Sequence, residues 1–83
     1  MAYNISYKKS VQRDLKTISK AETTRILDKI EKELTKKAGD YPMLKGEYAG
    51  LRKFRVGDSR VIFAIMDDNV LVLQIAHRKE AYR

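Results

Sequence analysis

The chain contains no cysteine and only one histidine among its 83 residues. Without cysteine it can form neither a disulfide framework nor a thiolate metal site. One histidine is too few for a histidine-based metal site. We therefore expect no metal and no other cofactor.

Long apolar runs are also missing. No stretch approaches the roughly 20 apolar residues that cross a bilayer, and the N-terminus lacks the apolar segment of a secretory signal. The length leaves room for a single domain with one core, spanning residues 1–83. We expect this domain to be cytoplasmic and to have no membrane partner.

Acidic residues are in short supply. The chain has 18 Lys and Arg against 11 Asp and Glu, which gives a formal net charge of +7 and a pI near 9.8. Such an excess favours a polyanionic partner, either nucleic acid or an acidic protein. A solvated basic surface without a partner is the alternative.

The first third of the chain predicts a strand and two helices. Residues 3–7 alternate apolar and polar side chains, as in a half-buried strand. Val11, Leu15 and Ile18 then recur at helical spacing, which predicts a short helix. A Ser-Lys-Ala-Glu sequence at residues 19–22 is typical of a capping box, in which the glutamate reaches back to the serine. A second helix therefore begins near residue 20.

The rest of the chain predicts three strands. The second helix ends before Gly39, and residues 40–50 hold the only proline and two of the four glycines, as in a loop. Runs of alternating residues at 51–56 and 60–66 flank a Gly-Asp turn, and residues 70–76 form a nearly unbroken apolar run typical of a central strand. The order predicts an α+β domain: an N-terminal strand, a two-helix hairpin and a three-stranded antiparallel meander, with the helices packed on one face of the sheet.

The predicted hairpin gathers positive charge on one face. If Val56 pairs with Ser59, Arg55 lies directly across from Arg60, and Lys53 shares their face. Like charges in such positions destabilise a sheet by a few tenths to about 1 kcal/mol per pair. We interpret this face as a site that an anion visits.

The turn near Asp67 leaves the register of the last strand open. A two-residue loop of Asp68 and Asn69 places Arg60 opposite His77. A three-residue loop instead pairs Met66 with Val70 and Arg60 with Ala76, and this register puts Arg78 on the face of Arg60. The sequence does not choose between the two.

Three segments resemble the RelE/ParE superfamily of prokaryotic toxins, and its RelE branch in particular. They are Leu-Lys-Gly at 44–46, Leu-Arg-Lys-Phe-Arg-Val-Gly-Asp-Ser-Arg-Val-Ile-Phe at 51–63 and His-Arg-Lys-Glu-Ala-Tyr at 77–82, after two helices. The resemblance covers essentially the whole chain and implies the RelE-like fold. It also implies a metal-independent endoribonuclease, an mRNA interferase that cuts messenger RNA in the ribosomal A site, inhibits translation and is neutralised by a cognate antitoxin.

The resemblance assigns basic active-site positions to Lys53, Arg55, Arg60 and Arg78, and an aromatic position to Tyr82. Where some members have a second lysine, this chain has Arg55, which cannot lose a proton near neutral pH. Lys53 is then the only lysine of the hairpin that can act as a base. We expect the catalytic residues to be Lys53, Arg60, Arg78 and Tyr82.

Metal-free RNA cleavage needs a 2′-hydroxyl to lose its proton, a phosphorane to be stabilised and the 5′-oxygen to be protonated. The planar fork of Arg60 suits the phosphorane because it can hold two oxygens at once. Arg78 would place charge near the leaving group, and Tyr82 could stack on a base. No residue is assigned as the proton donor. Histidine titrates in a suitable range, but a lone histidine such as His77 is more often a packing residue. We expect further RNA contacts from Arg55, Lys45, Arg52 and His77.

Two other functions stay open for this fold. ParE-like members poison DNA gyrase, which would leave messenger RNA intact, although the closing Arg-x-x-x-Tyr argues against that branch. A catalytically inactive domain that binds RNA or an antitoxin is the other alternative, against which Lys53 and Tyr82 argue. For the toxin, the net charge predicts an antitoxin with an acidic or amphipathic segment that covers the hairpin face or displaces the C-terminal end.

Overall fold

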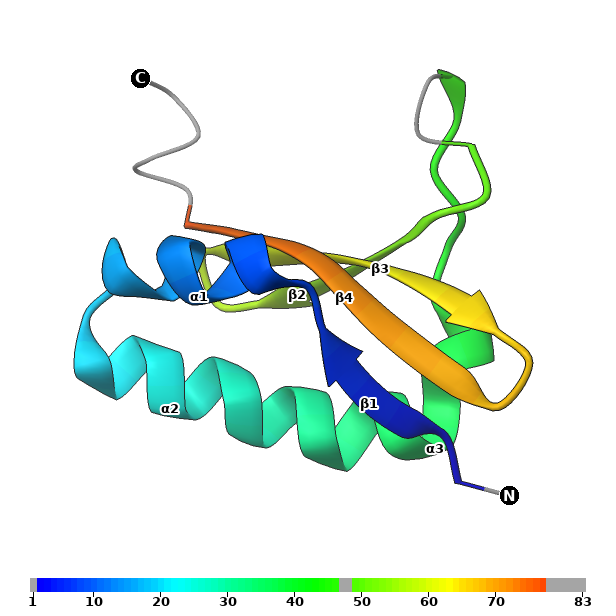
Figure 1. Ribbon diagram of the computed structural model, residues 1–83, viewed down its shortest axis with the longest axis horizontal. Coiled ribbons are helices and arrows are strands. Elements are labelled where there is room, and N and C mark those ends of the chain that lie inside the picture. Colours follow the sequence, from blue (N-terminus) through cyan, green and yellow to red (C-terminus); the bar gives the residue numbers. More distant parts are fainter. Residues whose placement is uncertain (1, 47–48, 78–83) are drawn as a thin grey trace.

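A four-stranded sheet with helices on one face forms the body of the molecule (Figure 1). The structure is a computed structural model that describes residues 2–46 and 49–77. The predicted α+β class and the order of its elements are confirmed. None of the helices in residues 2–46 and 49–77 has the length and hydrophobicity of a membrane-spanning segment.

The N-terminal strand β1 spans Asn4–Tyr7, and the first helix α1 spans Lys9–Lys16. Tyr3, Ile5 and Tyr7 pack against the core, as the alternation predicts. Val11 is the buried residue of α1.

The second helix is continuous but changes pitch. It runs as α2 (Lys20–Lys29), a π-helical turn η1 (Ile30–Leu34) and α3 (Thr35–Lys37), and a 3₁₀ turn η2 (Ala38–Asp40) follows. The predicted cap is confirmed, because the Glu22 amide donates to Ser19 Oγ over 3.3 Å. The carboxylate of Glu22 does not reach back as predicted, since its Oε1 lies 3.6 Å from Nη1 of Arg25.

The sheet has the strand order β1-β4-β3-β2. Strands β2 (Arg52–Val56), β3 (Ser59–Met66) and β4 (Asn69–His77) form the predicted antiparallel meander. Strand β1 pairs with β4 in parallel, so β4 is central, as its apolar run predicts. Strand β2 is left at the edge.

The predicted hairpin register is confirmed. Val56 pairs with Ser59, and Arg55 pairs with Arg60. Gly57 begins the two-residue turn with a φ of +59°, a conformation that favours glycine at the first central position.

The turn between β3 and β4 differs from both predictions. Met66 pairs with Asn69 across a loop of Asp67 and Asp68, so neither predicted loop is correct. A β-bulge between Ile62 and Phe63 then shifts the register by one residue, because Ile62 pairs with Gln74 while Phe63 pairs with Val72. Beyond this bulge Arg60 pairs with Ala76. The three-residue loop predicts the same pairing, but here it results from a two-residue loop followed by the bulge.

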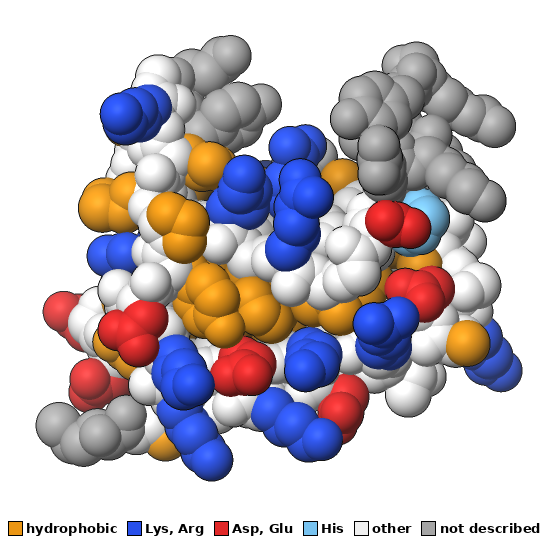
Figure 2. All heavy atoms as spheres, turned by 180° about the vertical axis from the view of Figure 1, so that it is seen from behind, with side chains coloured by type: hydrophobic (Ala, Val, Ile, Leu, Met, Phe, Trp, Pro, Cys, Tyr) orange, Lys and Arg blue, Asp and Glu red, His pale blue; other side chains and the backbone are white. Residues whose placement is uncertain are grey.

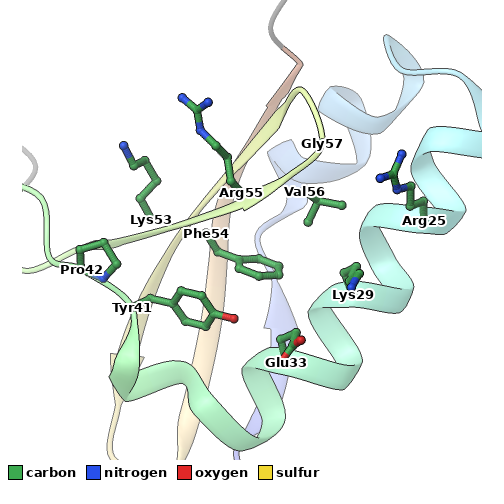
Figure 3. Close-up of a pocket in the computed structure, with 10 residues that line it drawn as sticks. All are labelled: Arg25, Lys29, Glu33, Tyr41, Pro42, Lys53, Phe54, Arg55, Val56 and Gly57. Carbon is green, nitrogen blue, oxygen red and sulfur yellow. The ribbon is translucent and has the colours of Figure 1, made fainter.

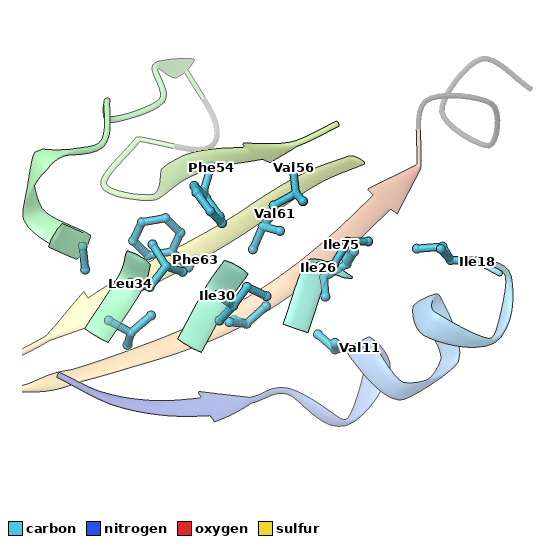
Figure 4. Close-up of a cluster of buried hydrophobic side chains, with 13 residues drawn as sticks. Val11, Ile18, Ile26, Ile30, Leu34, Phe54, Val56, Val61, Phe63 and Ile75 are labelled. Carbon is cyan, nitrogen blue, oxygen red and sulfur yellow. The ribbon is translucent and has the colours of Figure 1, made fainter. Parts of the chain in front are cut away.

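The core lies between the helices and the inner face of the sheet (Figure 4). Ile26, Ile30 and Leu34 from the second helix are fully buried. They pack in one cluster with the sheet residues Phe54, Val56, Val61, Phe63, Val70, Val72 and Ile75. Burial of these inward residues fixes which side chains of β2 and β3 must point outward.

Candidate nucleic-acid interface

Three cations share the outer face of the hairpin. Phe54 and Val56 are buried against the helices, so Lys53 and Arg55 between them point the other way. Figure 3 shows the side chains of Lys53 and Arg55 extending away from α2. Arg60 is exposed and lies directly across from Arg55, and residues in such a pair point to the same face. The structure therefore brings together the three cations that the register predicts.

The three cations of this face form no ion pair with a described residue. Ion pairs within residues 2–46 and 49–77 join Arg25 to Glu22 and Lys32 to Asp28, and none reaches the hairpin face. Two like charges directly across from each other, as in the pair of Arg55 and Arg60, destabilise the sheet when no carboxylate lies between them. An external anion would relieve the repulsion.

Other predicted site residues are placed differently. The guanidinium of Arg52 donates to the carbonyls of Tyr41 and Gly39 over 2.6 and 3.3 Å, which ties β2 to the chain leaving the second helix. Lys45 is exposed in the loop. Contact of either with RNA stays a prediction. Arg78 and Tyr82 lie outside the described residues.

A hollow of about 390 Å³ adjoins Arg60 on the side of α1. Its lining combines the C-terminal end of α1 with the last residues of β4: Asp14, Thr17, Arg60, Gln74, Ile75, Ala76 and His77. Of these residues, Arg60 and His77 were expected at the site. Asp14, Thr17 and Gln74 were missed.

Asp14 owes its position to the short first strand. Strand β1 stops pairing with β4 at Tyr7 and Val72, which opens the edge of β4 beyond that point. There the amide of Ile75 donates to Oδ2 of Asp14 over 3.1 Å. The only sequence signal was a carboxylate between the basic residues Arg13 and Lys16.

A groove of about 570 Å³ runs between α2 and the edge strand β2. Figure 3 shows the rings of Tyr41 and Phe54 between the two elements, and their centroids lie 4.9 Å apart in an edge-to-face contact. Burial raises the pKa of Tyr41, and the carboxylates of Glu33 and Asp40 raise it further. The lining is Arg25, Lys29, Glu33, Tyr41, Pro42, Lys53, Phe54, Arg55, Val56 and Gly57.

Charge around this groove is strongly biased. The second helix lines it with the cations Arg25 and Lys29 and the anion Glu33, whereas Lys53 and Arg55 belong to the lining from β2 but extend their side chains away from α2. Figure 2 shows a band of hydrophobic side chains with Lys and Arg side chains above it and a mixture of Lys, Arg, Asp and Glu side chains below it. Sequence reasoning missed the groove, which forms only when the second helix packs beside β2.

The described residues offer no cluster of metal-binding side chains. Among residues 2–46 and 49–77, no group of three or more His, Asp or Glu side chains is arranged to hold a metal ion.

Several solved structures share the fold. A RelBE2 toxin–antitoxin complex from Mycobacterium tuberculosis matches with a TM-score of 0.88 at 22% identity, covering 94% of this chain and 100% of the other. A RelE–RelB complex from Pyrococcus horikoshii is 30% identical, with a TM-score of 0.67 and coverage of 94% and 97%. The ParDE system of Pseudomonas aeruginosa matches at 0.76 and 13% identity, covering 92% and 96%.

No curated protein sequence matches the chain. The family model for the ParE toxin of the type II toxin–antitoxin system parDE, in contrast, matches residues 5–82. That match spans nearly the whole sequence and agrees with the fold shared with the RelE and ParE structures. The chain is therefore a toxin of the RelE/ParE superfamily and belongs to the ParE toxin family of type II toxin–antitoxin systems.

Proposed function

We propose that this toxin is a ribosome-dependent endoribonuclease that cuts messenger RNA in the A site and so inhibits translation. One observation carries the proposal: Lys53, Arg55 and Arg60 share one face of the hairpin and have no ion pair with a described residue. Such a face suits a polyanion whose backbone passes over it. RNA on the ribosome is a polyanion of this kind.

The proposed reaction is a transfer within the RNA. Lys53 acts as the general base that accepts the proton of a 2′-hydroxyl, whose oxygen then bonds to the adjacent phosphorus. Arg60 holds two non-bridging oxygens of the resulting phosphorane. The bond from phosphorus to the 5′-oxygen breaks, and that oxygen takes a proton. The products are a 2′,3′-cyclic phosphate and a 5′-hydroxyl. Arg78 and Tyr82 are proposed to supply charge at the leaving group and a stacking surface.

Replacing Arg60 tests the proposal. Arg60→Ala should lower the rate of cleavage on programmed ribosomes by about 10² to 10³, because a preorganised donor to the phosphorane is lost. The side chain is exposed, so the fold should persist. Arg13→Ala, which removes an exposed arginine from α1, is the matched control. Cleavage that is equal in the two variants would remove Arg60 from the site.

Inhibition of DNA gyrase is the second candidate function. The match to the ParE toxin family favours it. Purified toxin would then block supercoiling by gyrase at concentrations that leave ribosome-bound messages intact. The two assays on one preparation separate the candidates, because the ribonuclease cuts the message and leaves supercoiling unchanged.

We also propose that a cognate antitoxin lays an acidic, amphipathic segment along the groove between α2 and β2. The rings of Tyr41 and Phe54 and the cations Arg25 and Lys29 fit a segment with apolar side chains on one side and carboxylates facing the helix. The matched RelE structures were solved with their antitoxins, which supports the existence of such a partner.

Charge reversal at Lys29 tests this docking. Lys29→Glu should weaken the complex with the antitoxin by roughly tenfold at low salt and by less at high salt, because salt screens the charges that line the groove. Lys9→Glu reverses an exposed lysine of α1 outside the groove and serves as the control. Equal affinities for the two variants, measured by calorimetry, would place the antitoxin elsewhere.

A further inference from the structure

The hollow beside Arg60 has a different chemical character from the hairpin face. Besides the cation Arg60, its lining includes the polar residues Asp14, Thr17, Gln74 and His77. A carboxylate at this place repels a second phosphate. The hollow is therefore suited to an uncharged polar group next to the phosphate site, and not to the next phosphate of the RNA backbone.

Two oxygen-bearing side chains of the lining, those of Asp14 and Thr17, are held by hydrogen bonds. Oδ2 of Asp14 accepts from the Ile75 amide over 3.1 Å, which anchors the carboxylate to the central strand and leaves Oδ1 as an acceptor. The hydroxyl of Thr17 donates to the carbonyl of Asp14 over 2.7 Å, so its oxygen can only accept from a ligand. The α1 side of the hollow thus presents acceptors.

Those acceptors select among the bases of RNA. Adenine, cytosine and guanine each carry an exocyclic amino group that can donate to a carboxylate. Uracil has carbonyl oxygens at those positions, and its one edge donor, N3–H, lies between the two oxygens, which a carboxylate repels. Single-stranded bases are commonly read in this way on their exposed edges. A volume of about 390 Å³ lies within the usual range for a small-molecule site.

We propose that this hollow reads one base beside the cleaved bond, and that Asp14 gives it a preference for a base with an exocyclic amino group. The proposal rests on the ribonuclease function, since Arg60 both lines the hollow and is assigned to the phosphate. Gln74 pairs with Ile62 and belongs to the same lining.

Asp14→Asn is the decisive substitution. The amide keeps an oxygen for the Ile75 amide and replaces the second carboxylate oxygen, an acceptor, by an NH2 donor. Full-length protein is assayed on ribosomes whose messages differ at a single A-site base. At one codon position the wild type should cut amino-bearing bases roughly tenfold faster than uracil, and Asp14→Asn should abolish or reverse that ratio. Asp28→Asn, an exposed carboxylate on α2, should leave the ratio unchanged.

Other results overturn the proposal in distinguishable ways. A wild type that cuts no message contradicts the ribonuclease function itself. Cleavage with the same base ratio in Asp14→Asn, or an equal loss for all four bases, contradicts base reading alone. If Asp14→Asn does not fold, Gln74→Glu replaces it, because this exposed side chain adds a second acceptor without touching the Ile75 hydrogen bond. Gln74→Glu should raise the preference for amino-bearing bases, and an unchanged ratio there also overturns the proposal.

Discussion

Arg55 and Arg60 form a cross-strand pair that works against the stability of the hairpin. Arg55→Thr should raise the free energy of unfolding by a few tenths to about 1 kcal/mol at low salt, because it removes the like-charge repulsion. Urea denaturation measures this change. The gain should shrink at high salt, where exposed charges are screened.

Threonine also favours strands, so the stability gained by removing the charge repulsion at Arg55 has to be separated from the stability gained through strand propensity. The double variant with Arg60→Thr closes a mutant cycle that isolates the pair. A coupling energy of zero would show that the two guanidinium groups do not repel each other, and the case for a missing anion would lose its energetic basis.

The strands and their pairing were predicted well where neighbouring residues in the sequence determine them. A glycine between two alternating runs defines the β2–β3 turn, and the period of two then fixes Arg55 across from Arg60. The bulge at Ile62 and Phe63 has no such signal, because it depends on how the twisted strands fit the core. The position of Arg60 opposite Ala76 therefore could not be derived from the turn alone.

Helix α1 is joined to β4 through Asp14, and the two groups are 61 residues apart in sequence. A contact at that separation leaves no trace in local periodicity, which explains why Asp14 and Thr17 were missed. The groove beside β2 was missed for the same reason. The cations of the hairpin were found because their neighbours on the strand define their face.

Removing the carboxylate of Asp14 should loosen this junction. Asp14→Ala leaves the Ile75 amide without its acceptor and should lower the free energy of unfolding by about 1 to 3 kcal/mol. Asp28→Ala, which breaks only an exposed pair with Lys32, should cost at most about 0.5 kcal/mol. Equal losses in urea denaturation would mean that the Ile75 amide finds another acceptor.

At the scale of the whole molecule, stability should fall in alkaline solution. Burial raises the pKa of Tyr7 from 10.0 to about 12, and the charge of Glu31 contributes a smaller part. Between these two values the unfolded chain releases the phenol proton while the folded protein keeps it. The unfolded state then binds fewer protons, so the free energy of unfolding decreases as the pH rises through this window.

Tyr7→Phe removes this titration and should flatten the alkaline decline. At pH 8 the phenol is neutral in both states, so the difference in unfolding free energy between wild type and variant measures only packing and hydrogen bonding. Above pH 10 the wild type should lose stability faster, and the difference should move in favour of the variant. Denaturant titrations at several pH values test this directly. Two curves that stay parallel up to pH 12 would mean that the folded protein does not shield the Tyr7 phenol, and β1 would then be less firmly packed on the core than its contacts indicate.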